Sequence, residues 1–220
     1  MANGVRRITN SGSKKIIGKF PSLKMDTIIW WESQIERDYI YLLEIDPTVQ
    51  SYRGQPFKIT YISKGVTKNY TPDFWVQRIG QQQVIEVKPA SQVNDQKNLD
   101  KWRHISHLCE ERSMRFMVVT DTMIRQQPKL DNIKLLYKYA RSPFTLQQYL
   151  DCQCYFTSRE PTPFKQVCHD LERKGIYPNL LFKLLYFGWL STDLMESIGA
   201  ASLIQLSQFK GDVQALLLDV

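Results

Sequence analysis

The stretch from Tyr70 to Pro89, YTPDFWVQRIGQQQVIEVKP, most constrains the fold because it places charged residues in two short apolar runs. The runs flank a polar turn in which Gly80 is the expected positive-φ residue, so they predict a β-hairpin. Asp73 lies in the first run, and Glu86 and Lys88 lie in the second. Side chains alternate faces along a strand, so Glu86 and Lys88 share a face and the hairpin brings Asp73 beside them.

Two neighbouring carboxylates raise each other's pKa unless a cation joins them. Lys88 supplies one positive charge, and a divalent metal ion would supply two more. Mg²⁺ prefers oxygen ligands, usually one or two carboxylates with waters and phosphate oxygens, so Asp73 and Glu86 fit a Mg²⁺ site in which Mn²⁺ is expected to substitute. Such an ion polarises a phosphate and activates water, while Lys88 would stabilise charge that develops during cleavage. The alternative reading of these residues is a structural ion pair at a sheet edge.

The flanking segments predict a mixed α/β domain with helices packed on the faces of a sheet. Ser33 and Glu36 form a capping-box pattern at the start of a helix that ends at Asp46-Pro47. Glu36 would bring a third carboxylate to the site. The remaining pattern predicts strands over residues 57–63, 69–78, 83–88 and 115–120, and a helix over residues 94–112.

The C-terminal part is expected to be mostly helical and winged-helix-like. Periodicity predicts helices over residues 131–141, 144–150 and 178–187, and one that starts with Thr162 as N-cap and Pro163 in the first turn. A small hairpin is expected after them. The predicted division is a basic flexible arm over residues 1–24, a nuclease-like domain over residues 25–125 and a C-terminal domain over residues 126–220.

The formal net charge of +7 is consistent with a polyanionic partner, although charge alone sets no mechanism. The arm is either a solvated tail or a segment that tracks phosphates. Candidate DNA-binding lysines are Lys14, Lys15 and Lys19 in the arm and Lys97 and Lys101 in the helix after the charged strands. The sequence has no run of roughly 20 apolar residues and no apolar signal-peptide core, so we expect a soluble intracellular protein without a membrane partner.

Five blocks in order resemble one nuclease family. The Asp73, Glu86 and Lys88 spacing on a hairpin, after a helix with Glu36, resembles the PD-(D/E)XK nuclease superfamily. The runs GKFPSLKM, WESQIERDYIYLLEIDP, QPFKITY, YTPDFWV and VIEVKP resemble TnsA, the endonuclease subunit of heteromeric transposases that include CRISPR-associated ones. The resemblance spans roughly residues 15–140 and continues more weakly into the C-terminal helices.

This resemblance implies a restriction-endonuclease-like fold and cleavage of double-stranded DNA at the 5′ ends of a transposon. It implies two partners, a TnsB-like DDE transposase that processes the 3′ ends and a TnsC-like AAA+ ATPase, and a bacterial cytoplasmic, nucleoid-associated location. Glu36, Asp73 and Glu86 would hold Mg²⁺, with the carbonyl of Val87 as a further ligand and Lys88 as the catalytic lysine. The family is expected to carry Gln in its best-studied branch where this chain has Glu86. A stand-alone restriction or repair nuclease and a catalytically weak DNA-bridging subunit remain alternatives.

Overall fold

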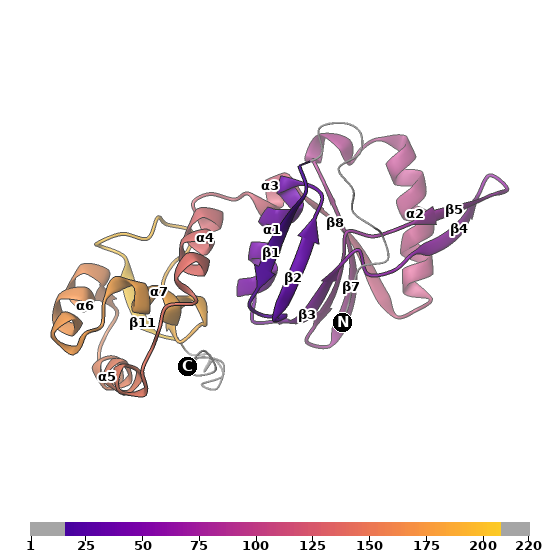
Figure 1. Cartoon of the computed structure of the whole chain (residues 1–220). Helices are drawn as coiled ribbons and strands as arrows, with labels where there is room; N and C mark the ends of the chain where they lie inside the picture. Colours follow the sequence, from indigo (N-terminus) through magenta and orange to yellow (C-terminus); the bar gives the residue numbers. More distant parts are fainter. Residues whose placement is uncertain (1–15, 208–220) are drawn as a thin grey trace. The chain divides into compact units, whose positions relative to one another are not determined.

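The computed structural model describes residues 16–207 and divides between Arg125 and Gln126 into two compact units (Figure 1). We call them the N-terminal and C-terminal units and describe each by itself. The chain is mixed α/β, with a mixed sheet and flanking helices in the first unit and mostly helices in the second, as the sequence predicted. Within residues 16–207, no helix has the length and apolar character that crossing a membrane requires.

A four-stranded sheet forms the centre of the N-terminal unit. Its strand order is β3-β6-β7-β8, and only the β7–β8 pair is parallel. Val84 and Ile85 in β7 are fully buried, which is typical of a strand with packed layers on both of its faces. The strands are β3 Val49–Gly54, β6 Phe74–Arg78, β7 Gln81–Lys88 and β8 Met114–Thr120; the helices are α1 Gln34–Ile45, η1 Ala90–Gln92, α2 Gln96–Glu110 and α3 Asp121–Ile124.

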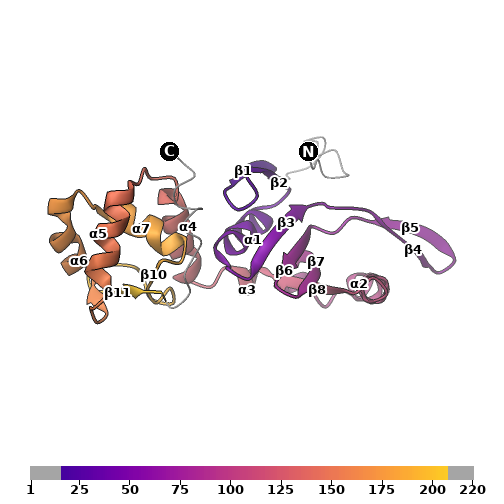
Figure 2. The same cartoon turned by 90° about the horizontal axis from the view of Figure 1, so that it is seen from below.

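The predicted hairpin is confirmed, because β6 pairs antiparallel with β7 and Gly80 has φ of 74°. The single strand expected over residues 69–78 is wrong. It breaks at Thr71–Asp73, where Pro72 has no N–H to donate to a ladder. Its first two residues belong to β5, Val66–Tyr70, which pairs with β4, Ile59–Ser63, in a separate two-stranded sheet. This β4–β5 hairpin extends away from the central sheet (Figures 1 and 2).

Part of the segment expected to be a flexible arm, residues 1–24, is folded. Residues 1–15, which include Lys14 and Lys15, lie outside the described residues. Residues 18–24 are folded, because β1, Gly18–Ser22, pairs with β2, Thr27–Trp31, and packs on α1. The apolar alternation of Phe20 with Ile29 and Trp31 buries one face of this hairpin, a signal that the basic residues obscured.

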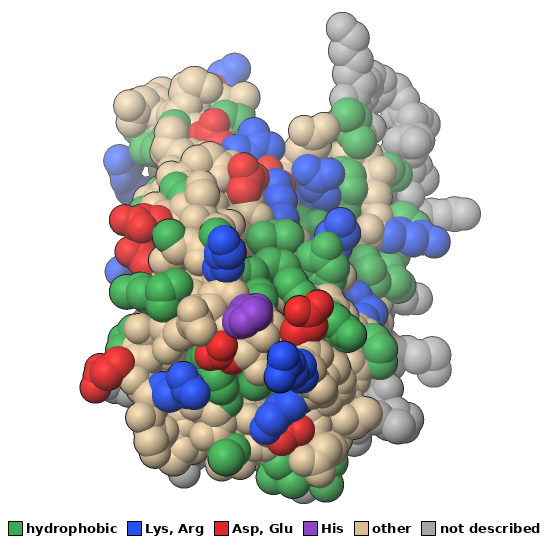
Figure 3. Space-filling model, turned by 90° about the vertical axis from the view of Figure 1, so that its left-hand side faces the viewer, with side chains coloured by type: hydrophobic (Ala, Val, Ile, Leu, Met, Phe, Trp, Pro, Cys, Tyr) green, Lys and Arg blue, Asp and Glu red, His purple; other side chains and the backbone are tan. Residues whose placement is uncertain are grey.

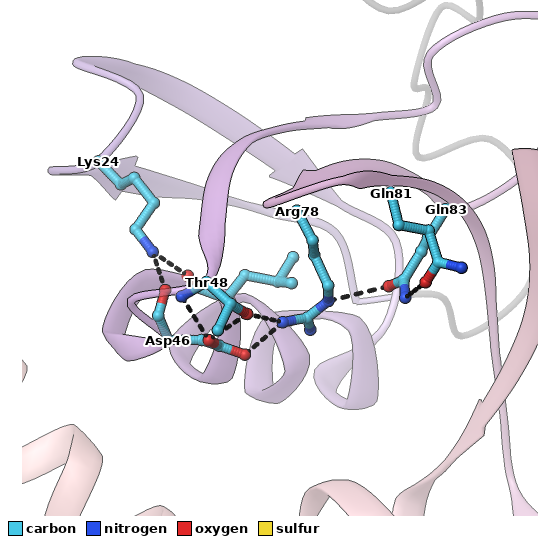
Figure 4. Close-up of polar contacts among 7 residues, drawn as sticks. Lys24, Asp46, Thr48, Arg78, Gln81 and Gln83 are labelled. Carbon is cyan, nitrogen blue, oxygen red and sulfur yellow. Dashed lines mark hydrogen bonds and ion pairs between the residues drawn. The ribbon is translucent and has the colours of Figure 1, made fainter.

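A polar network ties the β1–β2 hairpin and the strand ends to the end of α1 (Figure 4). Lys24 Nζ donates to the carbonyl oxygens of Leu43 and Asp46, at 2.7 and 2.6 Å. The Asp46 carboxylate accepts from Thr48 and Arg78, and Arg78 Nε donates to Gln83. Lys24 therefore caps the carbonyl end of the helix, where a positive charge is favourable.

The C-terminal unit packs helices against a small three-stranded antiparallel sheet of order β10-β11-β9. Thr162 and Pro163, expected as the N-cap and first turn of a helix, form the short strand β9 instead, because they pair with Ile204 and Leu203. Basic, acidic and hydrophobic side chains are interspersed on the face in Figure 3. The elements are α4 Lys129–Tyr139, α5 Leu146–Phe156, β9 Thr162–Pro163, α6 Phe164–Leu171, η2 Glu172–Lys174, α7 Pro178–Tyr186, β10 Leu190–Ser191 and β11 Leu203–Leu206.

Candidate active site

Asp73 and Glu86 face each other at the open end of the β6–β7 hairpin. The register pairs Phe74 with Ile85, so the next step along both strands sets Asp73 opposite Glu86. The position of Asp73 is fixed from two sides. Its carbonyl oxygen accepts from Gln55 N–H at 2.9 Å, and its Oδ2 accepts from Val87 N–H at 2.7 Å.

The Glu86 carboxylate is buried and held by three side chains. Its Oε1 lies 3.1 Å from Lys88 Nζ and 3.4 Å from Lys101 Nζ, and its Oε2 accepts a short hydrogen bond from the Tyr70 hydroxyl. Glu86 is 3% exposed, so the two ammonium groups screen a charge that water does not reach. A buried carboxylate with partners on both oxygens is rigid, which suits a group that has to orient a ligand.

The electrostatics of this cluster favour an added cation. Burial, followed by the charges of Glu86 and Glu36, raises the pKa of Asp73 well above its ordinary value. Burial lowers the pKa of Lys88, but the carboxylates of Glu86, Asp73 and Glu36 outweigh it, so the net direction is upward. Lys88 is therefore an ammonium at neutral pH, and the pair Asp73 and Glu86 is the kind of anionic site that a divalent ion stabilises.

Glu36 lies at the start of α1, where Ser33 is the N-cap as predicted. The reciprocal half of the capping box differs, because the Glu36 carboxylate accepts from the Ser33 hydroxyl and the Glu32 N–H instead of the Ser33 N–H. Ser33 accepts from Glu36 N–H, and in return Glu36 Oε1 accepts from Ser33 Oγ at 2.9 Å. Glu36 Oε2 accepts from Glu32 N–H at 2.7 Å. Burial, as the largest cause, raises the pKa of Glu36. Both oxygens of Glu36 thus serve the cap, although its charge is close enough to act on Asp73.

The expected ligand set of three carboxylates is not assembled in this structure. Within residues 16–207, no three His, Cys, Asp or Glu side chains are grouped so that they could hold one metal ion. The donors that do fit are the carboxylates of Asp73 and Glu86, and Mg²⁺ commonly takes two protein carboxylates with waters in its other positions. Glu36 would have to release its hydrogen bonds to the helix start before it could join them.

The backbone of Val87 offers a further oxygen. Continuing the β6–β7 register sets Val87 opposite Pro72, and a hydrogen-bonded antiparallel pair exchanges bonds through both N–H and C=O. Pro72 has no N–H, and the Val87 N–H goes to Asp73. Pro72 therefore cannot donate a hydrogen bond to the Val87 carbonyl.

The structure distributes the expected DNA-binding lysines over different surroundings. Lys19 lies on β1 with its Nζ 4.8 Å from the centre of the Trp30 ring. Lys97 is exposed at the start of α2. Lys101, one turn further along α2, contacts Glu86 and lies 5.2 Å from the centre of the Tyr70 ring, so it belongs to the site itself.

Sequence reasoning gave Tyr70 no role in the site, and it named Lys101 only as a DNA-binding candidate. Burial, followed by the Glu86 charge, raises the pKa of Tyr70, which keeps its hydroxyl protonated as a donor to Glu86. The signal for Tyr70 was its position three residues before Asp73. Lys101 was expected only to bind DNA; its contact with Glu86 could not be predicted, because it depends on how α2 packs against β8 and β4.

Comparison with known families supports a nuclease assignment. Residues 46–121 match the family described as TnsA-like endonuclease N terminal. The matched range holds Asp73, Glu86, Lys88 and Lys101, and it leaves Glu36 and the C-terminal unit outside. No curated protein matches the chain. The buried Glu86, the partly buried Asp73 and two lysines lie inside the matched range, so residues 46–121 resemble a TnsA-like endonuclease domain, which supports a nuclease subunit of a transposase.

Proposed function

We propose that this protein is the Mg²⁺-dependent endonuclease subunit of a heteromeric transposase of the CRISPR-associated type. It cuts the 5′ ends of the transposon while a TnsB-like DDE transposase processes the 3′ ends. The observation that carries the proposal is the pair Asp73 and buried Glu86, which lie opposite each other beside Lys88 inside the range that matches the TnsA-like endonuclease family. Such a subunit would act on DNA in the bacterial cytoplasm.

In the proposed reaction, Asp73 and Glu86 would hold Mg²⁺, with the carbonyl of Val87 as a third protein oxygen. The bound ion supplies Lewis-acid activation of the scissile phosphate and of a water. Lys88 contributes a positive charge that is fixed before the substrate arrives, because it is already held against Glu86 at 3.1 Å. A fixed charge needs no reorganisation as negative charge grows on the phosphate, which is the basis of electrostatic catalysis.

Hydrogen bonds around the site fix the orientation of the two carboxylates. Val87 N–H orients the Asp73 carboxylate, and the Tyr70 hydroxyl orients Glu86 from the opposite side. Lys101 shares the Glu86 oxygen with Lys88 and neutralises the site while no metal is bound. We further propose that the C-terminal unit docks the TnsB-like transposase and a TnsC-like ATPase, a role that its winged-helix-like arrangement supports.

The test is strand-specific cleavage of labelled transposon-end DNA with Mg²⁺, the TnsB-like transposase and the targeting components. Asp73→Ala is expected to lose the 5′ cut by at least a factor of about 100, comparable to removal of one transition-state contact, while 3′ joining persists. Asp100→Ala is a matched control, because Asp100 is on the surface of α2. Unchanged 5′ cleavage by Asp73→Ala would refute the site. Efficient cleavage by the pure protein would favour a stand-alone nuclease, and no 5′ cut by the wild type in the full assay would favour a bridging subunit.

A further inference from the structure

We propose that the β4–β5 hairpin is a DNA-binding element that holds the phosphate backbone next to the cleavage site. This inference rests on the proposed nuclease function and adds a contact surface to it. The hairpin consists of Ile59–Ser63 and Val66–Tyr70 with Lys64 and Gly65 at its turn, and it projects from the N-terminal unit (Figure 2).

The charged side chains in the β4–β5 hairpin and directly before it in the chain are all positive. No Asp or Glu occurs between Asp46 and Asp73, whereas the same stretch contains Arg53, Lys58, Lys64 and Lys68. The three lysines are exposed and lie in the hairpin or directly before it. An element with a local positive charge and no acidic neighbour in sequence is complementary to a polyanion.

The base of the hairpin is anchored, but its outer part has no core of its own. Ile59 and Tyr70 pair with each other and are buried in a cluster with Ile105 and Cys109 of α2. Tyr61 lies beside His104, with 5.8 Å between the ring centres. Towards the turn, Ile62 is 68% exposed, and residues 64–69 are all exposed. A two-stranded ribbon with so little buried surface is marginal by itself, which is typical of an element completed by a ligand.

The hairpin is continuous with the candidate active site. Tyr70, its last residue, donates to Glu86, and Asp73 follows three residues later. From Tyr70 to Val66 an extended strand covers about 13 Å, which corresponds to about four base pairs along B-DNA at 3.4 Å each. A duplex with its scissile phosphate at Asp73 and Glu86 therefore has phosphates within reach of Lys64 and Lys68.

The shape also suits a nucleic acid. A two-stranded β-ribbon fits into the major groove of B-DNA. One face of the hairpin carries Thr60, which is hydrogen-bonded to Asn69 at 2.9 Å, and Ile62 opposite Thr67, whereas Lys68 lies on the other face opposite Tyr61. Contacts from Lys64 and Lys68 to phosphates would fix the position of a duplex without reading its sequence. The hairpin would thus place the DNA, while partner proteins supply recognition of the transposon end.

The first experiment measures binding of the full-length protein to a fluorescein-labelled transposon-end duplex in EDTA, so that no cleavage occurs. Fluorescence anisotropy over about 50 to 200 mM salt gives the slope of log K against log salt. The variant Lys64→Ala/Lys68→Ala is expected to reduce the magnitude of this slope by about 2, because each lost phosphate contact removes about 0.9. Arg112→Ala/Lys165→Ala removes the same charge from exposed sites elsewhere and is expected to leave the slope unchanged.

The second experiment places a photo-cross-linking amino acid at Ile62, with the exposed Leu146 as control position. Cross-links from position 62 to the duplex within a few base pairs of the 5′ cut are expected. Three outcomes would each overturn the hairpin proposal. They are an equal salt slope for the hairpin variant and the wild type, no DNA binding by the wild type, and cross-links from position 62 only to a partner protein. In each of these cases, normal 5′ cleavage in the full assay would still support the proposed nuclease function. Failure of the hairpin proposal is therefore distinguishable from failure of the nuclease proposal.

Discussion

At the scale of single residues, this chain buries charges where partners are available on more than one element. Glu86 is satisfied by Lys88 from its own strand, Lys101 from α2 and Tyr70 from β5. Lys24 is likewise held by two carbonyl oxygens at the end of α1. The spacing of Asp73, Glu86 and Lys88 could be predicted from sequence because strand alternation and one short turn determine it. Lys101 and Tyr70 could not, since their contacts arise from packing between elements.

The partly buried ammonium of Lys24 gives a pH-dependent prediction. Burial is the main cause that lowers its pKa to about 8 from 10.5, so the folded state loses this proton before the unfolded state does. Between these values the unfolded chain binds more protons, and the free energy of unfolding attributable to Lys24 therefore rises with pH. Urea unfolding at both ends of this window is expected to show the rise in wild type and not in Lys24→Met. Lys165→Met, at an exposed position, should retain the rise, and an equal pH dependence for wild type and Lys24→Met would contradict this account.

At the scale of elements, the start of α1 and the β1–β2 hairpin show where local signals and packing each decide. The Ser33 N-cap is visible in the sequence and forms as expected. The sequence analysis assigned the residues of β1 to a flexible arm because the segment is basic. In the structure, Phe20 of β1 packs edge-on against Tyr41 of α1, with 4.9 Å between the ring centres. A solvated charged face does not prevent a strand whose other face is buried.

The cap of α1 separates a structural from a catalytic role for Glu36. Ser33→Ala removes the side chain that accepts from Glu36 N–H and is expected to lower the free energy of unfolding by about 1 kcal/mol. Glu36→Gln retains an acceptor for Glu32 N–H, so it should cost less stability. If Glu36 also serves the metal site, Glu36→Gln loses 5′ cleavage while remaining folded, and Ser33→Ala retains it. Cleavage by Glu36→Gln at the wild-type rate would restrict Glu36 to capping the helix.

The folded β1–β2 hairpin is tested by Gly18→Ala. A Cβ on Gly18 would lie 2.2 Å from Cζ2 of the buried Trp31 ring, so the ring or the strand has to shift. Overpacking of this kind is expected to lower stability by about 1 to 3 kcal/mol. Gly199→Ala is the control, because the nearest atom to its added Cβ is 3.9 Å away. Equal thermal stability of the two variants would mean that residues 18–22 do not pack in solution as the structure shows.

At the scale of the whole molecule, two units each bury their own core. In the C-terminal unit the core includes Ile133, Val167, Leu181 and Ile204, which come from helices and from the small sheet. Asn132 joins α4 to the segment after β10, because its amide donates to the carbonyl oxygens of Leu194 and Glu196. A unit with its own core and its own long-range hydrogen bonds fulfils the conditions for independent folding.

This independence predicts that a fragment of residues 126–220 folds without the N-terminal unit. Its thermal unfolding, followed by circular dichroism, is expected to be a single cooperative transition. Asn132→Ala in the fragment should lower the midpoint, since it removes the hydrogen bonds from the buried Asn132 amide to the carbonyl oxygens of Leu194 and Glu196. A fragment with a gradual, non-cooperative melt would show that the C-terminal unit requires the rest of the chain.

The sequence by itself determined the local features of this protein. Alternation fixed the β6–β7 hairpin, the Ser33–Glu36 pattern fixed the start of α1, and the spacing of Asp73, Glu86 and Lys88 fixed the centre of the candidate site. Each depends on neighbours within a few residues or across one tight turn. The tertiary structure decided what depends on distant segments: the separate β4–β5 hairpin, the folded Gly18–Ser22 strand, the place of Lys101 at Glu86 and the use of Glu36 in a helix cap. The physical reason is that residue order does not specify which distant side chains come into contact, whereas tertiary packing does.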